Sequence, residues 1–515
     1  MATLVLGIDV GTTSTKVVLA DPAAGVVAQA SEPVALSSPH PGWAEADPSQ
    51  WWANLAVLVP AVLAAASGAT GRAVTAADIA AVATTGMVPA VIPVDGAGRP
   101  LRSAILQNDA RAATEIRELA AALPDLDFVA RTGSALTQQS VGPTLLWLAR
   151  HEPDAWASAV TVQGSYDWLA TRLGAAPHVE RNWALESGLF ELEQDGALTP
   201  LQPVRDALAR LGGIKPDVIP TVADPGTVIG EVSRGAAAET GLRPGTPIVA
   251  GGADHVLSAY AAGLASPGDW LVKLGGAGDI LVVSGHPLVD ERLYLDAHPV
   301  SGLWLPNGCM ATSGSLIRWF QSVSGGASVA ELEAEAIAAT PAELICLPYF
   351  LGEKSPLHDP DLRGAFLGLH LGHTRGDMYR AILEGIAYGF RHHAEIFTER
   401  KVALRPSARV SNGGSKSLVW KQILADALGV ALEPVLDHPG AALGAALAAG
   451  VGAAGAPTPQ AWAAAASVPG MVTIGTPIEP DPAHAARYAE AYRIYRDAGA
   501  ALTPISHQLA RRSMS

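Results

Sequence analysis

The sequence predicts an α/β protein with two large domains, and three observations support this prediction. The chain has 515 residues, which is too long for one compact unit. An apolar strand, a Gly-rich turn and a second apolar strand occur at residues 3–20 and again at 270–284. Apolar strand patterns alternate with helical patterns in the rest of the chain, which is typical of sheets covered by helices. The repeated hairpin indicates a duplicated domain with a ligand cleft between its two copies.

The first hairpin, LVLGIDVGTTSTKVVLAD, has the composition of a phosphate-binding turn. Gly11 lets the backbone approach an anion closely, and the hydroxyl-bearing residues after it offer hydrogen-bond donors. Asp9, near the end of the first strand, could hold a hydrated Mg²⁺ ion against a nucleotide. The predicted phosphate contacts are Gly11, Thr12, Thr13 and Lys16. An ordinary hairpin with a Gly/Thr turn has the same residues, so this segment alone leaves both interpretations open.

The remainder of the first half predicts strands and helices in turn. Asp47-Pro48 is typical of a helix start, and residues 79–95 indicate two buried strands around a break that can carry ligand contacts. The other predicted elements are a strand near Val26 and Val27, helices at 110–122 and 142–151, and an insertion or cap at 156–195. A shift to Pro, Gly and Val at 217–250 places the domain boundary there. We therefore expect domains at 1–249 and 250–515.

The best candidate for a catalytic group follows that boundary. An apolar run ends at Gly251-Gly252, and Asp254 comes next, at the start of a helix of small residues. Sheets of the α/β class place their ligand chemistry at such strand ends. Phosphoryl transfer to a hydroxyl group needs a carboxylate that orients the hydroxyl and accepts its proton, so Asp254 is the candidate general base. The alternative is a helix cap, and His255 beside it is interpreted as structural.

The second half repeats the phosphate-binding plan. Gly275 and Gly276 form the turn of the second hairpin, and Gly413 and Gly414 stand between a strand and a helix in RVSNGGSKS. A flat nucleoside could lie against that helix N-terminus, although a plain Gly-rich loop has the same composition. The helices predicted further along are a buried one at 374–397 with Thr374 and Asp377 as its capping pair, a tightly packed one at 440–456, and a final one at 484–500 with its tyrosines in the core.

Composition narrows the class of protein. The formal net charge of −15 disfavours a nucleic-acid partner or an anionic membrane surface. The two cysteines make a disulfide framework implausible and fit a reducing compartment. No secretion signal is recognisable near the start, and the most lipid-like stretch, 440–456, is mostly Ala and Gly. We expect a cytoplasmic protein that binds small molecules, with no nucleic acid and no membrane.

Together these segments resemble the FGGY family of carbohydrate kinases over essentially the whole chain. The most specific match is GAFLGLHLGHTRGDMYRAILE at 364–384. The resemblance implies two ribonuclease-H-like domains, as in the actin and hexokinase ATPases, with an interdomain cleft for ATP, Mg²⁺ and a sugar. It implies roles for three groups of residues: Asp9, Thr12, Thr13 and Lys16 in the first phosphate motif, Asp254 as the base, and Gly413, Gly414, Ser415 and Lys416 in the adenosine motif. Similar kinases are commonly dimers, so a homodimer is an open expectation.

The xylulokinase branch of the family is the most similar. The resemblance rests on GWAEADPSQWW at 42–52, on LPYFLGEKSPLHDPDLRGAFLGL at 347–369, and on QNDAR at 107–111. It implies that Asp109 and Arg111 line or brace the sugar pocket.

Three departures from the branch fall at the expected site. Met87 and Val88 stand where xylulokinases carry a Met-His pair that touches the ketose, and we expect them to contact the substrate. Gly275-Gly276-Ala277 replaces a turn that usually carries hydroxyl groups, and NWALESG at 182–188 replaces a usual Asp-Ala-Ser-Gly-Thr stretch. The expected activity is phosphorylation of a ketopentose by ATP, with D-xylulose as the first candidate. Ribulose, a tetrulose, a deoxy sugar, a sugar alcohol and a non-catalytic regulator remain open alternatives.

Overall fold

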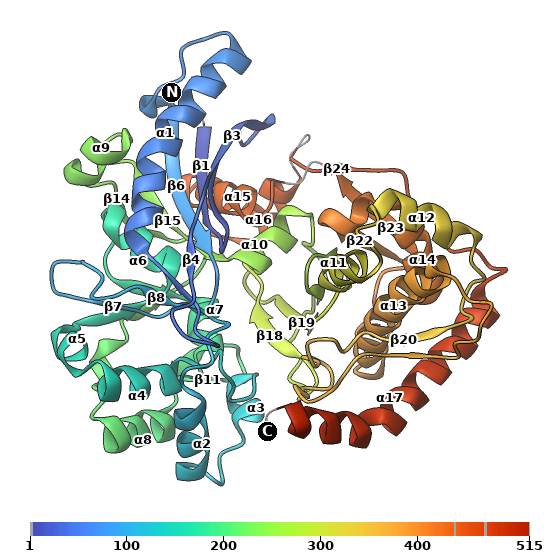
Figure 1. Cartoon of the computed structure of the whole chain (residues 1–515). Coiled ribbons are helices and arrows are strands. Elements are labelled where there is room, and N and C mark those ends of the chain that lie inside the picture. The colour runs from blue at the N-terminus through green and yellow to red at the C-terminus, as the bar shows by residue number, and fades with distance from the viewer. Residues whose placement is uncertain (1–3, 437–438, 468–470, 514–515) are drawn as a thin grey trace.

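Two lobes, each built on one large mixed sheet, make up the computed structural model, which describes residues 4–436, 439–467 and 471–513 (Figure 1). The first sheet holds, in spatial order, β14 (Val228–Glu231), β15 (Pro247–Ala253), β6 (Ile79–Gly86), β1 (Leu4–Val10), β2 (Ser14–Asp21) and β3 (Gly25–Pro33). The second holds β18 (Tyr294–Ala297), β19 (Trp304–Met310), β17 (Gly278–Val282), β16 (Trp270–Leu274), β22 (Ser407–Ser411), β23 (Ala431–Leu436) and β24 (Thr473–Ile474).

Shorter strands form small separate sheets. They are β4 (Leu36–Ser37), β5 (Glu45–Ala46), β7 (Ile92–Val94), β8 (Ala104–Ile105), β9 (Thr161–Gln163), β10 (His178–Glu180), β11 (Phe190–Leu192), β12 (Leu198–Pro200), β13 (Thr221–Ala223), β20 (Ile345–Leu347) and β21 (Ala365–Leu367).

Helices surround the sheets and fill the lower part of the first lobe (Figure 1). Those up to the second hairpin are α1 (Pro48–Thr70), α2 (Ala113–Ala122), α3 (Phe128–Thr132), α4 (Val141–His151), α5 (Pro153–Ser158), α6 (Ser165–Leu173), α7 (Arg181–Glu186), α8 (Gln202–Gly212), α9 (Arg234–Thr240) and α10 (Asp254–Ala261). The later ones are α11 (Gly314–Val323), α12 (Val329–Ala338), α13 (Arg375–Glu399), α14 (Leu418–Leu428), α15 (Ala441–Ala453), α16 (Pro459–Ala466) and α17 (Ala485–Ser513).

The two large sheets share one topology. In the first, β1 pairs antiparallel with β2 and parallel with β6, and β6 pairs parallel with β15. In the second, β16 pairs antiparallel with β17 and parallel with β22, and β22 pairs parallel with β23. The duplication expected from the two hairpins is therefore present in the strand order. The predicted fold class, α/β with two ribonuclease-H-like domains, is confirmed.

Helix α15 comes from the C-terminal part of the chain but packs on the first sheet, beside β1 and β6 (Figure 1). Close packing depends on glycine, because a Cβ on Gly7 would lie 1.9 Å from the carbonyl oxygen of Ala442. A Cβ on Gly444 would lie 2.3 Å from the carbonyl oxygen of Leu257. The predicted tight packing of this Ala- and Gly-rich segment is confirmed. The predicted boundary at residue 250 falls within β15, a strand of the first sheet, so the division at that position stays a prediction.

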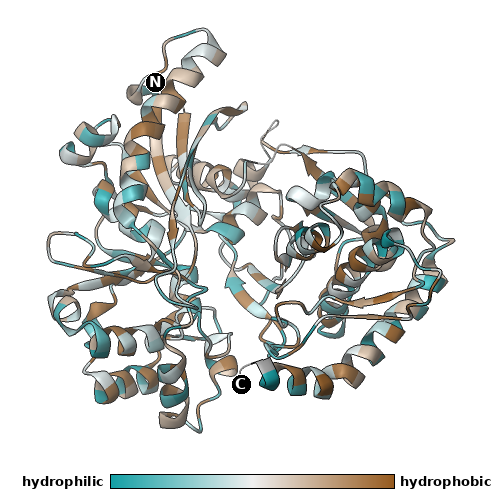
Figure 2. Ribbon diagram, viewed as in Figure 1, coloured by the Kyte–Doolittle hydropathy of each residue, from teal (hydrophilic) through white to brown (hydrophobic). Residues whose placement is uncertain are grey.

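Local signals for helices agree with the structure. Asp47 caps α1 through the backbone N–H of Ser49, and Thr374 and Asp377 form the capping box of α13. Among the described residues, α1 alone is long and apolar enough to cross a membrane by length and composition. One side of α1 packs on β2 and β3, as expected for a helix that covers a sheet in a protein core. Figure 2 shows that α1 carries both hydrophobic and hydrophilic residues.

Buried histidines make the stability of this fold depend on pH. His298 accepts a hydrogen bond from the backbone N–H of Val300 at Nδ1, and its Nε2 lies 2.9 Å from the carbonyl oxygen of Leu264. Burial lowers the pKa of His298 from 6.5 to about 4, so the unfolded chain binds the proton first as pH falls. We expect the free energy of unfolding to fall by about 3 kcal/mol between pH 6.5 and 4 from this group.

Chemical denaturation at a series of pH values tests that expectation. His298→Gln keeps one donor and one acceptor but does not titrate, so the variant should lose less stability over the same interval. Equal pH slopes for the variant and the unchanged protein would contradict the assignment.

Candidate active site

Two cavities meet at the turn of the second hairpin. The first, the sugar-side cavity, has a volume of about 470 Å³ and is lined by residues of both lobes, among them Thr12, Val88, Gln107, Glu186, Asp254 and Asp296. The second, the nucleotide-side cavity, has about 610 Å³ and lies in the second lobe, with Arg318, Gly413, Gly414, Lys416 and Trp420 in its wall. Gly275, Gly276 and Asn412 line both cavities. A group held at this turn can therefore be reached from either side.

Asp254 stands at the junction of a strand and a helix. Strand β15 can run close beside β6 because a Cβ on Gly251 would lie 1.8 Å from the carbonyl oxygen of Thr84. The helix then begins at Asp254, whose side chain is 38% exposed and lines the sugar-side cavity. Its Oδ1 accepts the backbone N–H of His255, and the N-cap position belongs to Ala253. A carboxylate open to the cavity fits a base better than a cap.

Asp9 lies on β1, next to the first phosphate turn, and carries an unpaired oxygen. Its Oδ1 is buried and has no hydrogen-bond partner in the described part of the chain. Burial, together with the nearby Asp254 carboxylate, raises the pKa of Asp9 to about 8, against the opposing charges of Lys16 and Lys273. An orphaned carboxylate oxygen beside a second carboxylate is chemically suited to a hard cation or to a water that the cation holds.

The first hairpin places its predicted contacts in different environments. Thr12 lines the sugar-side cavity, and Gly11 closes the turn by donating its N–H to the carbonyl of Ser14. Thr13 is exposed. Lys16, by contrast, lies in neither cavity wall, because its Nζ donates to the carbonyl oxygen of Pro439 at 3.2 Å. The charge of Lys16 acts on Asp9 beside the turn, and its predicted contact with a phosphate stays a proposal.

The second turn is anchored from behind. The carbonyl of Gly276 accepts the backbone N–H groups of Ser313 and Ser315, and the hydroxyl of Ser315 donates to the same oxygen. A Cβ on Gly276 would lie 3.3 Å from Nη2 of Arg318, so this guanidinium stands directly over the hydroxyl-free turn. No ion-pair partner of Arg318 occurs among residues 4–436, 439–467 and 471–513. No recognisable motif surrounds Arg318, so the sequence alone does not point to this residue.

The predicted adenosine motif lies in the nucleotide-side cavity in part. Gly413, Gly414 and Lys416 line that cavity, and a Cβ on Gly414 would lie 2.4 Å from the ring of Trp420. Glycine is therefore required where the turn meets the aromatic wall. Ser415 is an exception, because its hydroxyl donates to the carbonyl of Asn412 within the same turn.

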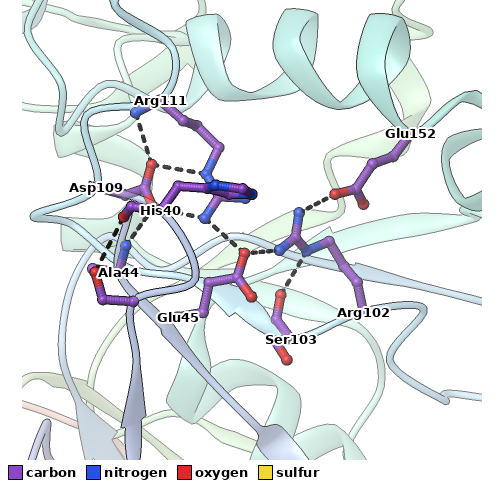
Figure 3. A network of polar contacts seen from close by, with 9 residues as sticks. His40, Ala44, Glu45, Arg102, Ser103, Asp109, Arg111 and Glu152 are labelled. Carbon is purple, nitrogen blue, oxygen red and sulfur yellow. Dashed lines mark hydrogen bonds and ion pairs between the residues drawn. The ribbon is translucent and has the colours of Figure 1, made fainter. Parts of the chain in front are cut away.

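The predicted sugar contacts separate into two groups. Val88 lines the sugar-side cavity, whereas Met87 is buried in the core of the first lobe. Asp109 and Arg111 are also buried and do not line the cavity. Figure 3 shows Arg111 paired with Asp109, and the Arg111 guanidinium also donates a hydrogen bond to the carboxylate of Glu45. They support the loop that presents Gln107 rather than touch the cavity.

That buried network is tightly connected (Figure 3). Arg111 donates Nε and Nη2 to the two carboxylate oxygens of Asp109 at 2.8 and 2.7 Å, and Asp109 also accepts the N–H of Ala44 at 2.6 Å. The guanidinium carbon lies 3.8 Å from the ring centre of Trp43. Burial would lower the pKa of Arg111, but the hydrogen bonds that its guanidinium donates to Asp109 and Glu45 raise it, so the cation is held permanently.

The sequence alone does not predict several polar residues of the sugar-side cavity. It favours a structural role for His255 and indicates no role for four others that line the cavity: Gln107, Glu186, Asp296 and Asn307. The signal that could have found Glu186 was the NWALESG departure at 182–188, which contains this residue. Asp296 and Asn307 lie on neighbouring strands whose pairing only the fold reveals.

Comparison with known proteins gives a consistent result. Residues 4–261 match the N-terminal domain, and residues 276–453 the C-terminal domain, of the FGGY family of carbohydrate kinases. Xylulose kinase of Escherichia coli K12 is 28% identical over 433 residues, covering 83% of this chain and 85% of that protein. L-xylulose/3-keto-L-gulonate kinase of the same organism is 29% identical over 462 residues, covering 87% and 88%. The crystal structure of xylulose kinase from Rhodospirillum rubrum has 41% identity and a TM-score of 0.86, covering 98% of this chain and all of that one.

Proposed function

This chain belongs to the FGGY family of carbohydrate kinases and is a sugar kinase, and we propose that it transfers the γ-phosphoryl group of ATP to a hydroxyl of a ketopentose. D-xylulose, giving D-xylulose 5-phosphate, is the first candidate substrate. Asp254 is proposed as the general base. Relatives named for xylulose and the shared architecture support this choice of substrate class.

One observation carries the proposal: the sugar-side and nucleotide-side cavities share Gly275, Gly276 and Asn412. A nucleoside held near Gly414 and Trp420 extends its phosphates toward that turn. A sugar in the other cavity has its hydroxyl near Asp254 and approaches the same turn from the opposite side. Phosphoryl transfer requires the sugar hydroxyl and the γ-phosphoryl group of ATP to meet in line at one place.

The chain's own residues supply the proton and charge chemistry. Asp254 orients the attacking hydroxyl and accepts its proton as the new oxygen–phosphorus bond forms. Backbone N–H groups of the Gly-rich turns and the cations Lys273 and Arg318 face the transferring charge. Asp9 is proposed to hold Mg²⁺ through water, and the ion supplies charge neutralisation of the phosphates when bound.

Other expectations stay proposals. They are a cytoplasmic location, a homodimer, and the absence of nucleic-acid and membrane partners. The alternative of a kinase for another sugar or polyol gains weight from the altered cavity wall at Val88 and Glu186.

The proposal is tested by ADP release from the purified protein with Mg-ATP and a panel of ketoses, aldoses and polyols. A single preferred ketopentose is the expected result. Turnover with another sugar would change the proposed substrate but leave the proposed phosphoryl transfer from ATP in place. Nucleotide binding without sugar-dependent ADP release would favour a regulator that kept the cleft and lost transfer.

Arg318 gives a specific prediction for the nucleotide side. Because this cation stands over a turn that lacks hydroxyl donors, Arg318→Ala should raise KM for Mg-ATP by about tenfold and leave KM for the sugar unchanged. Steady-state kinetics with each substrate varied in turn measures both constants. Arg363→Ala, which removes an arginine outside both cavities, is the matched control. Unchanged KM for Mg-ATP would remove Arg318 from the phosphate site.

A further inference from the structure

The sugar-side cavity has an acidic end and a basic end. Near the second phosphate turn, Asp279 pairs across strands with Cys309, and the ammonium groups of Lys273 and Lys354 lie 3.7 Å from Asp279 and 4.0 Å from the Cys309 sulfur. Further along the same strands, Leu281 pairs with Asn307, beyond which the side chain of Asp296 lies. The two lysines therefore lie at the phosphate end, beside Asp279, whereas Asp296 lies further along the strands, away from that end.

At the acidic end, three residues from separate elements converge. One ligand atom each of Glu186, His255 and Asp296 lies within 4.8 Å of the others. Nε2 of His255 lies 2.7 Å from Oδ2 of Asp296, and that oxygen also accepts the amide of Asn307 at 2.7 Å. Nδ1 of His255 lies 3.5 Å from Oδ1 of Asp254. The imidazole thus links the proposed base to the acidic end.

The position of Glu186 is fixed by the helix that carries it. Asn182, in the first turn of α7, donates its amide to the carbonyl of Ala297 at 3.0 Å and accepts the N–H of Ala297 at 2.7 Å. Helix α7 is thereby fixed beside β18, which carries Asp296. Glu186 ends that helix and lines the cavity.

The acidic end contains acceptor oxygens that the described residues leave unpaired. They are Oε1 of Gln107, Oε1 of Glu186 and Oδ1 of Asp296. Burial and the neighbouring Asp296 carboxylate raise the pKa of Glu186 well above its usual value, so Glu186 adds little negative charge here and acts through its acceptor oxygen. A buried acceptor without a donor costs free energy, so a bound ligand that supplies donors is favoured. The hydroxyl groups of a sugar donate hydrogen bonds, whereas a carboxylate can only accept them.

A metal ion fits this cluster poorly. Burial alone would lower the pKa of His255, but Asp296, Asp254 and Glu186 raise it well above its usual value. The two ring nitrogens already face carboxylates, Nε2 at 2.7 Å from Asp296 and Nδ1 at 3.5 Å from Asp254, and this arrangement favours the doubly protonated imidazole, which has no lone pair for a metal. The unpaired oxygens are therefore better matched by the hydroxyl donors of a substrate.

We propose that Glu186, with Gln107 and Asp296, selects a neutral polyhydroxy substrate and rejects a sugar acid. Hydroxyl groups of the neutral sugar donate to the unpaired oxygens at this end of the cavity. A substrate carboxylate would leave those oxygens unpaired and place a further negative charge beside Asp254 and Asp296. This inference rests on the proposed function, because it concerns the acceptor site of the same reaction.

Kinetics of Glu186 variants test the inference. The probes are the neutral sugar preferred in the panel and D-gluconate as the sugar acid. Glu186→Ala should raise KM for the neutral sugar by about 10–100-fold. The ratio of kcat/KM for the neutral sugar to kcat/KM for gluconate should fall by a similar factor. KM for Mg-ATP should stay unchanged. Glu186→Gln keeps an acceptor oxygen and should restore most of the affinity for the neutral sugar.

A control and a binding measurement separate the possible failures. Glu193→Gln changes an exposed glutamate of the same lobe and should match the unchanged protein. Calorimetric titration of the unchanged protein with the neutral sugar tests recognition without turnover. Binding that Glu186→Ala abolishes would support the inference even if no ADP is released, in which case the proposed function alone fails. A preference for gluconate, or equal affinity of Glu186→Ala and the unchanged protein for the neutral sugar, would overturn the inference.

Discussion

Replacing Asp254 by alanine is expected to lower kcat for sugar phosphorylation by about 10²–10⁴-fold. The side chain is open to the sugar-side cavity, at the start of α10, and its role concerns the acceptor hydroxyl rather than ATP. Binding of ADP should therefore change little. Single-turnover phosphoryl transfer, measured beside calorimetric binding of ADP, separates the two effects. Asp254→Asn keeps the size of the side chain but not the basicity, and should lose activity to a similar extent.

Asp224→Ala serves as the matched control, because Asp224 is an exposed aspartate of the same lobe that pairs with Arg181. It should keep the activity of the unchanged protein. Near-normal transfer by Asp254→Ala would remove this residue from the base role. Loss of ADP binding in the same variant would instead assign Asp254 to the nucleotide site.

Asp109→Ala is expected to destabilise the first lobe by about 3–5 kcal/mol. The variant leaves the Arg111 guanidinium buried with one carboxylate partner fewer, and it removes the acceptor for the N–H of Ala44. Both side chains of the pair are almost fully buried, at 1% and 2% exposed. The first unfolding transition in chemical denaturant measures this loss. KM for the sugar should also rise, because the loop that presents Gln107 loses its support.

An exposed ion pair provides a control for this prediction, because its loss should cost much less stability. Arg493 and Asp497 lie 3.2 Å apart on the surface of α17, and Asp497→Ala should cost less than about 1 kcal/mol. Combining Asp109→Ala with Arg111→Met should recover part of the loss, since it removes the unbalanced charge. If Asp109→Ala costs no more than Asp497→Ala, the network of Figure 3 contributes little to stability.

Much of the architecture could be predicted from local sequence. The hairpin at 3–20 forms β1 and β2, the hairpin at 270–284 forms β16 and β17, and Thr374 caps α13, because each depends on residues only a few positions apart. The place of Asp254 at a strand end also follows from its neighbours. The family resemblance rested on such local motifs, and the family matches confirm it.

The direction of individual side chains could not be predicted in the same way. Lys16 stands in the expected hairpin, yet its ammonium group binds Pro439, 423 positions away. For Asp109 and Arg111 the sequence leaves open whether they line or brace the sugar pocket, and buried contacts with Glu45 and Trp43 place them behind the cavity wall. Each outcome depends on which distant segment packs nearby, and no local pattern specifies that.

The sequence by itself determined the strand–turn–strand hairpins, the Gly-rich turns and the identity of Asp9 and Asp254 as the carboxylates beside them. Backbone preference and turn chemistry act between near neighbours, so they are encoded locally. Tertiary structure alone decided that Glu186, His255 and Asp296 converge, that Arg318 stands over Gly276, and that α15 returns to the first sheet. These arrangements arise when separate segments bury their surfaces together, because burial and close packing, unlike turn chemistry, are properties of the assembled chain.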